Sequence, residues 1–284
     1  FSALKFSVAG LLGGHSGDDI HKNRGNANKI LNRFLWNSAR KYDLRLAEFN
    51  GGKLRNAIAR EAFAICCVSE KDIKSIRSDF EKFSAKVSFE FERAEPGLKL
   101  QSEPTGLPGF VIDKKTQLNL LHALSACPHG VLEMSSRMTG MVETSTNLAS
   151  VKWVENDKIR IATSQRSELE SRKYMAAEMV ESLFLLAGAE VVHSDGYPGW
   201  APNPDSEVLK IAVDAYQKLF GVLPVVRSIH AGLECGLFLE KYPNLDMISF
   251  GPTIRGAHSP DERLDIQTTV KFWDHLIDVL ENIK

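Results

Sequence analysis

The chain has 284 residues, of which 43% are hydrophobic and 25% are charged, and its formal net charge is −1 at pH 7. This composition is typical of a globular protein, and it argues against nucleic acid or an anionic membrane as the main partner. No apolar run approaches the roughly 20 residues that span a bilayer, and the first residues lack the pattern of a signal peptide. The four cysteines show no CxxC spacing, so they indicate neither a disulfide framework nor a structural zinc site, and we expect a cytoplasmic protein.

Apolar spacing predicts alternating strands and helices in the first part of the chain. In chain order we expect a strand at 6–12, a helix at 27–42, two paired strands at 44–49 and 57–68, a helix at 73–87 and a strand at 98–101. The turn signal Asn50-Gly51-Gly52 separates the paired strands, as in a hairpin. The order strand, helix, two strands, helix, strand is a split β-α-β arrangement, which predicts an α+β layer with an antiparallel sheet.

A second group of elements follows before a marked change in composition. We expect a helix at 116–126, long strands at 141–154 and 159–164, a helix at 168–187 and a strand at 190–193. The stretch 194–204 then holds three prolines and two glycines. These residues disfavour both a helix and a central strand, so we predict a domain boundary there.

Beyond this boundary, helices alternate with short apolar runs. We expect helices at 208–219 and 235–241, strands at 222–229 and 247–250, and a final helix around 273–280. This alternation is typical of an α/β sheet with parallel strands. Two strands are too few for a self-sufficient domain of that kind. Because the chain also begins at Phe1 without an initiator Met, we expect a segment of a longer protein.

One histidine stands out at the end of the opening strand, in the run Gly13-Gly14-His15-Ser16-Gly17. Glycines on both sides allow backbone angles and close approaches that a Cβ would prevent. The sequence therefore predicts that something other than core packing sets the position of His15. The structural alternative is a histidine in a surface turn.

A second histidine, His258, follows the apolar run at 247–250, within the segment FGPTIRGAHSPDERLD. Ligands of α/β sheets gather beyond the carboxyl ends of the strands, where a histidine can bind a metal ion or a substrate. Ser259 with Glu262, or Asp265 alone, would cap the final helix without any functional role. For His258 itself, a hydrogen bond within the loop is the structural alternative.

The chain resembles the aminoacyl-histidine dipeptidases, a group within a family of di-zinc peptidases, in the phrases GLLGGHSGDDIHKNRGNA, GGKLRNAIARE, VETSTNLASV, DGYPGW, IHAGLECGLF and GPTIRGAHSPDERL. The resemblance runs over nearly the whole chain. It implies a lid and dimerisation domain at 1–196 and the last part of an α/β zinc-peptidase catalytic domain at 197–284. The region that holds most metal ligands and the general base in that family is not in this sequence. The resemblance therefore implies that this segment alone is close to inactive.

The resemblance also implies roles for particular residues. His15 matches the lid histidine that donates a hydrogen bond to the carbonyl oxygen of the peptide as negative charge develops on it. Asn56 and Arg166 match the residues that bind the free C-terminal carboxylate of the substrate, a task suited to an arginine fork with an amide. Glu234 lies in a loop at the rim of the active site, and His258 matches a zinc ligand.

The activity that the resemblance implies is metal-dependent hydrolysis of unblocked dipeptides, Xaa-His among them. Two divalent ions, identified by the resemblance as zinc, would polarise the carbonyl and activate water. The expected partners are a dipeptide substrate and a second copy of the chain, bound through the lid as a homodimer.

Two other functions stay open from the residues themselves. One is a non-catalytic oligomerisation or peptide-binding module, because an exposed sheet edge can pair with another chain. The other is a thiol peptidase in which Cys235 acts as nucleophile, with His230 nearby in the sequence as its base.

Overall fold

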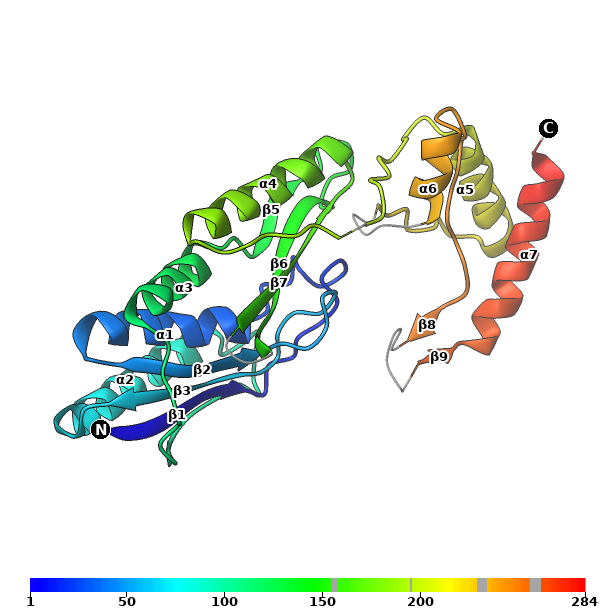
Figure 1. The fold of residues 1–284 in the computed structure, drawn as a ribbon. Coiled ribbons are helices and arrows are strands. Elements are labelled where there is room, and N and C mark those ends of the chain that lie inside the picture. Colours follow the sequence, from blue (N-terminus) through cyan, green and yellow to red (C-terminus); the bar gives the residue numbers. More distant parts are fainter. Residues whose placement is uncertain (155–157, 195, 229–233, 256–261, 284) are drawn as a thin grey trace. The chain divides into compact units, whose positions relative to one another are not determined.

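The structure, a computed structural model, describes all residues except 155–157, 195, 229–233, 256–261 and 284. It divides into two compact units, each with a core of its own (Figure 1). The larger unit holds residues 1–135 and 142–194, and the smaller unit holds 136–141, 196–228 and 234–283. The assignment of 1–196 to a lid and of 197–284 to a catalytic domain stays a prediction.

The first part of the larger unit follows the predicted order of strand, helix, two strands, helix and strand. Its elements are β1 (Ser2–Ala9), α1 (Ala27–Lys41), β2 (Arg45–Gly51), β3 (Ala62–Val68), the short 3-10 helix η1 (Glu70–Asp72), α2 (Ile73–Glu90) and β4 (Lys99–Thr105). The side chain of Asn26 caps α1 by accepting from the amides of Asn28 and Lys29, which explains why the helix begins where it does.

The second part of the larger unit contains α3 (Lys114–Ala126), β5 (Gly130–Met134), β6 (Val142–Val154), β7 (Lys158–Ser167) and α4 (Glu170–Leu186). The sequence analysis missed β5, which is short and begins at a glycine, a feature that by itself indicates a turn. The predicted strand at 190–193 is wrong. Val192 is 91% exposed there, and no described strand pairs with this segment.

These strands form one seven-stranded sheet in the order β4-β1-β3-β2-β6-β5, with β7 paired to β6. Every pairing that the structure describes is antiparallel. The predicted antiparallel sheet in a mixed α/β unit is therefore confirmed.

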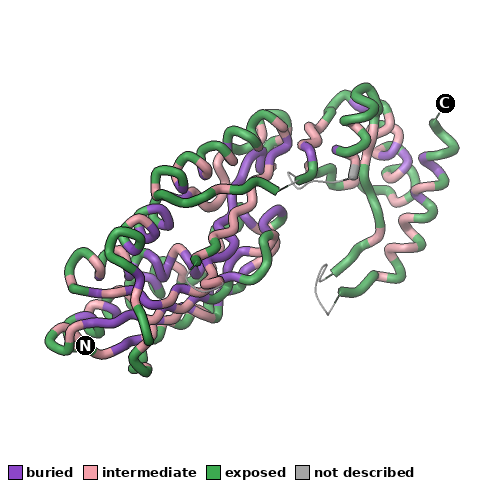
Figure 2. The backbone as a smooth tube through the Cα atoms, viewed as in Figure 1, coloured by how far each residue is buried: buried purple, intermediate pink, exposed green. Residues whose placement is uncertain are grey.

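The core of the larger unit lies between this sheet and its helices. Leu4, Phe6 and Val8 alternate along β1 and are buried, as one face of a strand requires. The ring of Phe6 lies 4.8 Å from that of Phe34 in α1 and 5.1 Å from that of Phe80 in α2, measured between centroids. Residues of α3 and α4 belong to the same buried cluster, so the helices share one core with the sheet. Figure 2 marks the buried residues along the backbone in purple. Burial of each such aromatic side chain contributes about 1.5–3 kcal/mol.

The smaller unit contains α5 (Glu207–Phe220), α6 (Glu234–Lys241), β8 (Ile254–Arg255), β9 (Arg263–Leu264) and α7 (Ile266–Asn282). Its buried cluster joins Ala212 and Ala215 of α5 with Val279 of α7. The side chain of Asp265 accepts from the amide of Thr268 and caps α7, as one of the two capping alternatives predicted. Among the residues that the structure covers, none of the helices is long and apolar enough to cross a membrane.

The parallel sheet predicted for this unit is wrong for the residues described. Segments 222–228 and 247–250 contain no strand, and the strands that are present, β8 and β9, pair antiparallel. Val222, Leu223 and Val225 are 57%, 65% and 77% exposed. An apolar run becomes a strand only where another strand takes up its backbone hydrogen bonds, and none of the described strands does so here.

Candidate functional site

The histidine predicted from the glycine-rich run lies in a loop between β1 and α1. A Cβ on Gly14 would overlap the side chains of Arg24 and Asp19, and the φ of Gly14 is +133°, a conformation that L side chains rarely adopt. The glycine is thus required for the loop to fold back on itself. His15, the next residue, is half-buried, with 28% of its side chain exposed.

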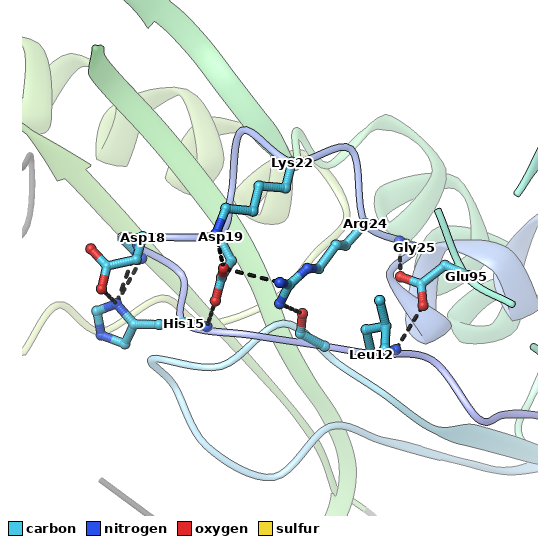
Figure 3. Close-up of polar contacts among 10 residues, drawn as sticks. Leu12, His15, Asp18, Asp19, Lys22, Arg24, Gly25 and Glu95 are labelled. Atoms are coloured by element: carbon cyan, nitrogen blue, oxygen red, sulfur yellow. Dashed lines mark hydrogen bonds and ion pairs between the residues drawn. The ribbon is translucent and has the colours of Figure 1, made fainter. Parts of the chain in front are cut away.

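Asp19 holds the backbone of this loop in place (Figure 3). Its Oδ2 accepts the amide of His15 at 2.8 Å, and its Oδ1 lies 2.8 Å from Nζ of Lys22 and 3.1 Å from Nη2 of Arg24. Burial by itself raises the pKa of the Asp19 carboxyl. The hydrogen bonds from Lys22 and His15 and the charge of Arg24 outweigh burial and hold this pKa below its usual value.

The surroundings of the His15 ring select one tautomer. The amides of Gly17 and Asp18 donate to Nδ1 at 3.2 Å and 3.4 Å. The Asp18 carboxylate lies 3.9 Å from the same atom, beyond hydrogen-bond distance. Because Nδ1 accepts two amide protons, it carries no proton of its own, and in the neutral ring the proton lies on Nε2. His15 is therefore a hydrogen-bond donor through Nε2.

Asn56 lies beside this loop. The amide of Ser16 donates to the Asn56 carbonyl at 2.8 Å, and His15 and Ala57 form an isolated antiparallel bridge. The residues before and after Asn56 are held by the buried Asn147 of β6, whose Nδ2 donates to the carbonyls of Arg55 (3.3 Å) and Ala57 (2.9 Å). The backbone on both sides of Asn56 is thus fixed by hydrogen bonds.

Arg166 reaches the same place from β7. Its Nε donates to Oγ of Ser16 at 3.1 Å. Burial lowers the pKa of Arg166, as does the nearby charge of Arg55, while the charge of Asp18 acts against both. The structure thus brings together three parts around Ser16: the backbone of Asn56, the loop that carries His15, and the guanidinium of Arg166. Sequence analysis missed Ser16, and only its place directly after His15 could have drawn attention to it.

The other two predicted site residues lie at the margins of what is described. Glu234 is the first residue of α6, but its side chain is outside the described part of the structure. All of His258 lies outside the described residues, and so does His230, the base of the thiol-peptidase alternative. The roles of Glu234 and His258 stay predictions.

A metal centre needs several suitable side chains close together. In the part of the chain that the structure describes, no group of three or more His, Cys, Asp or Glu residues could hold a metal ion. A zinc site takes three or four protein ligands. The described residues therefore do not fit a metal centre by themselves.

Comparison with known proteins assigns the chain to a family. The sequence profile described as Peptidase family M20/M25/M40 matches residues 10–282. The chain belongs to this peptidase family. The cytosol non-specific dipeptidase of Escherichia coli (strain K12) is 40% identical to this chain over 283 residues, which are 100% of this chain and 58% of that protein.

A solved structure agrees with this assignment. The aminoacylhistidine dipeptidase from Vibrio alginolyticus superimposes with a TM-score of 0.91 at 42% sequence identity, over 100% of this chain and 58% of that one. Both relatives are dipeptidases, that is, peptide hydrolases. The chain spans 58% of the length of each of these relatives.

Proposed function

We propose that this chain supplies the substrate-binding part of a dipeptidase that hydrolyses unblocked dipeptides, including Xaa-His. The observation that carries the proposal is the hydrogen bond from Arg166 to Ser16, which joins a half-buried guanidinium to the loop of His15. The names of the two relatives, both dipeptidases, support the same substrate class. We propose hydrolysis for a whole protein of this family and not for this chain alone, because the chain spans 58% of the length of each relative.

Arg166 and Asn56 would bind the free carboxylate of the dipeptide. Because Nε of Arg166 donates to Ser16, the terminal nitrogens Nη1 and Nη2 are the atoms with which it would bind the carboxylate. A guanidinium that is partly removed from water binds an anion more strongly than an exposed one does. The carboxylate of the substrate would add an opposite charge that offsets the loss of hydration on burial of Arg166.

His15 would act on the peptide carbonyl. The amides of Gly17 and Asp18 keep Nδ1 as an acceptor, so the Nε2–H donates. A donor placed before the reaction begins stabilises the negative charge that develops on the carbonyl oxygen in the transition state. No proton has to leave the ring for this role.

The finer predictions from the resemblance belong to the same proposal. They are metal dependence through two divalent ions, zinc by resemblance, with His258 as one ligand; a rim role for Glu234; a homodimer formed through the lid; and a cytoplasmic location. The described residues would contribute to substrate binding and not to the metal ligands, since His258 lies outside them.

The free carboxylate gives a direct test. Isothermal titration calorimetry of the purified chain would compare β-alanyl-histidine with its C-terminal amide, which differs only in lacking the charged carboxylate. We expect saturable binding of the free dipeptide and at least roughly tenfold weaker binding of the amide, because a charge-assisted hydrogen bond is lost. Equal affinity for both would contradict the proposal and leave the peptide-binding or oligomerisation module as the better explanation.

A further inference from the structure

We infer that Glu95 is a positioning residue for the candidate site, because its carboxylate fastens both ends of the loop that carries His15. The inference concerns the loop itself, and its consequence for substrate rests on the function proposed above for His15. Glu95 comes from the segment between α2 and β4, far from the loop in sequence.

Each of the two carboxylate oxygens of Glu95 accepts a hydrogen bond from one end of the loop (Figure 3). Oε2 accepts the amide of Leu12 at 2.6 Å, and Oε1 accepts the amide of Gly25 at 2.8 Å. Leu12 precedes the glycine-rich run, and Gly25 precedes Asn26, the cap of α1. One side chain therefore holds together the two ends of the loop between β1 and α1. We call this pair of hydrogen bonds the neck of the loop.

Glu95 can serve as an anchor because its own backbone is fixed. Its amide donates to the carbonyl of Phe91 at 2.8 Å, and its carbonyl accepts from the amide of Leu98 at 3.0 Å. A Cβ on Gly10 would overlap the carbonyl oxygen of Gly97, so the start of the loop runs in direct backbone contact with the Glu95 segment. Glu95 as a whole is only 2% exposed.

A carboxylate is suited to joining the two ends of the loop, because it has two acceptor oxygens. Both partners are N–H donors, so the group between them must accept twice, which an ionised carboxylate does and an amide does not. Glutamine at this position would turn an NH2 group toward one of the two amides. That amide would lose its acceptor, at the greatest cost for Gly25, whose bond to Glu95 is buried, and the neck of the loop would open more often.

A change at the neck should alter the position of the His15 ring. Between the two ends, Asp19 binds the His15 amide, and Nη1 of Arg24 donates to the carbonyl of Gly13. These two contacts lie inside the loop. Backbone hydrogen bonds from Ser16 to Asn56 and from Ile58 to Gly14 hold its middle against the segment that follows β2. The neck at Glu95 is therefore one of the contacts that fix the loop, and with it the His15 ring, against the rest of the unit.

The test compares Glu95→Gln with Glu92→Gln, a matched control at an exposed position in the same segment. Amide hydrogen exchange of the purified chain measures opening of the loop. Nitrogen NMR of the imidazole, assigned with a His15→Gln variant, reports the tautomer of His15. We expect Glu95→Gln to speed exchange in residues 11–25 by roughly tenfold and to shift the His15 ring signals, while Glu92→Gln changes neither. If Glu95→Gln unfolds, Glu95→Asp, which keeps the charge but shortens the reach, replaces it.

The outcomes separate this inference from the proposed function. Unchanged exchange in 11–25 and an unchanged His15 signal in Glu95→Gln would overturn the inference. A faster exchange with unaltered His15 signals would overturn the positioning role, because the neck would then not govern the ring. If both change while the unsubstituted chain binds no dipeptide, the inference stands and the proposed function fails.

Discussion

The guanidinium of Arg166 and the hydroxyl of Ser16 meet at 3.1 Å, although 150 residues separate them in the chain. The contact joins β7 to the loop that begins where β1 ends. It depends on the central strand β6, which pairs with β7 over most of its length and holds the Asn56 segment through Asn147. The sheet thus brings together distant segments that can form a site for a small anionic substrate.

Arg166→Ala should weaken dipeptide binding strongly. It removes the guanidinium proposed to bind the carboxylate, and we expect a loss of about 2 kcal/mol, or roughly 30-fold in affinity. Arg160→Ala is the matched control, since Arg160 lies in the same strand but is exposed. Calorimetric titration of both variants with β-alanyl-histidine provides the measurement. Similar losses in the two variants would point to general charge rather than to a site.

Ser16→Ala should weaken binding less, by about 1–2 kcal/mol, because the guanidinium stays but loses the acceptor that orients it. Ser16 is 1% exposed, so no water can readily replace its hydroxyl. Ser78→Ala, at an exposed position of α2, is the control. The same titration checks this expectation, and full affinity in Ser16→Ala would show that Arg166 needs no such partner.

His129 should make stability fall in mild acid. Burial, and secondarily the charge of Lys29, lowers the pKa of His129 from 6.5 to about 4. Between these values the unfolded chain binds a proton that the folded chain does not, so stability is full above the unfolded value and declines as the pH falls toward about 4. The decline amounts to about 3 kcal/mol at most. Urea unfolding followed by circular dichroism across this range measures it.

The matching variant is His129→Gln, which cannot take up the proton. It should lose this part of the pH dependence even if its stability near neutral pH is lower, since Nδ1 of His129 accepts from the amide of Leu148 at 3.3 Å. An identical pH profile in both proteins would assign the acid sensitivity to other groups.

Phe34→Ala should destabilise the larger unit by about 3–5 kcal/mol, because it empties the space between β1 and α2. The Phe34 ring lies 4.8 Å from that of Phe6 and 4.8 Å from that of Phe80, measured between centroids. Phe89 on α2 is 79% exposed, and Phe89→Ala should cost less than about 0.5 kcal/mol. Thermal unfolding of the two variants compares them directly. A small effect of Phe34→Ala would mean that the helices do not share the core described above.

Sequence patterns predicted the larger unit well because its elements carry their own signals. The apolar face of α1 and the alternation in β1 each reflect burial against a single partner layer. The errors fall on short apolar runs, such as 222–228 and 247–250, whose conformation depends on whether another strand lies beside them. The strand predicted at 98–101 continues through Pro104 to Thr105, because a proline is tolerated in a strand at the end of the sheet order.

The candidate site was predictable only in part. The glycines around His15 signalled an unusual backbone, which the φ of Gly14 bears out. Ser16 and Glu95 carried no such signal, since a serine or glutamate in these positions is ordinary until the fold shows which distant groups it meets. Hydrogen bonds between remote segments depend on tertiary geometry, which spacing along the chain does not encode.

The central claim is that the His15 loop, the Asn56 turn and Arg166 form one site for a dipeptide carboxylate. The most direct measurement is backbone amide NMR of the purified chain during titration with β-alanyl-histidine. We expect saturable shifts in residues 15–18, 55–57 and 166, which the C-terminal amide of the dipeptide does not reproduce. Shifts confined to other residues, or the same shifts with the amide, would contradict it.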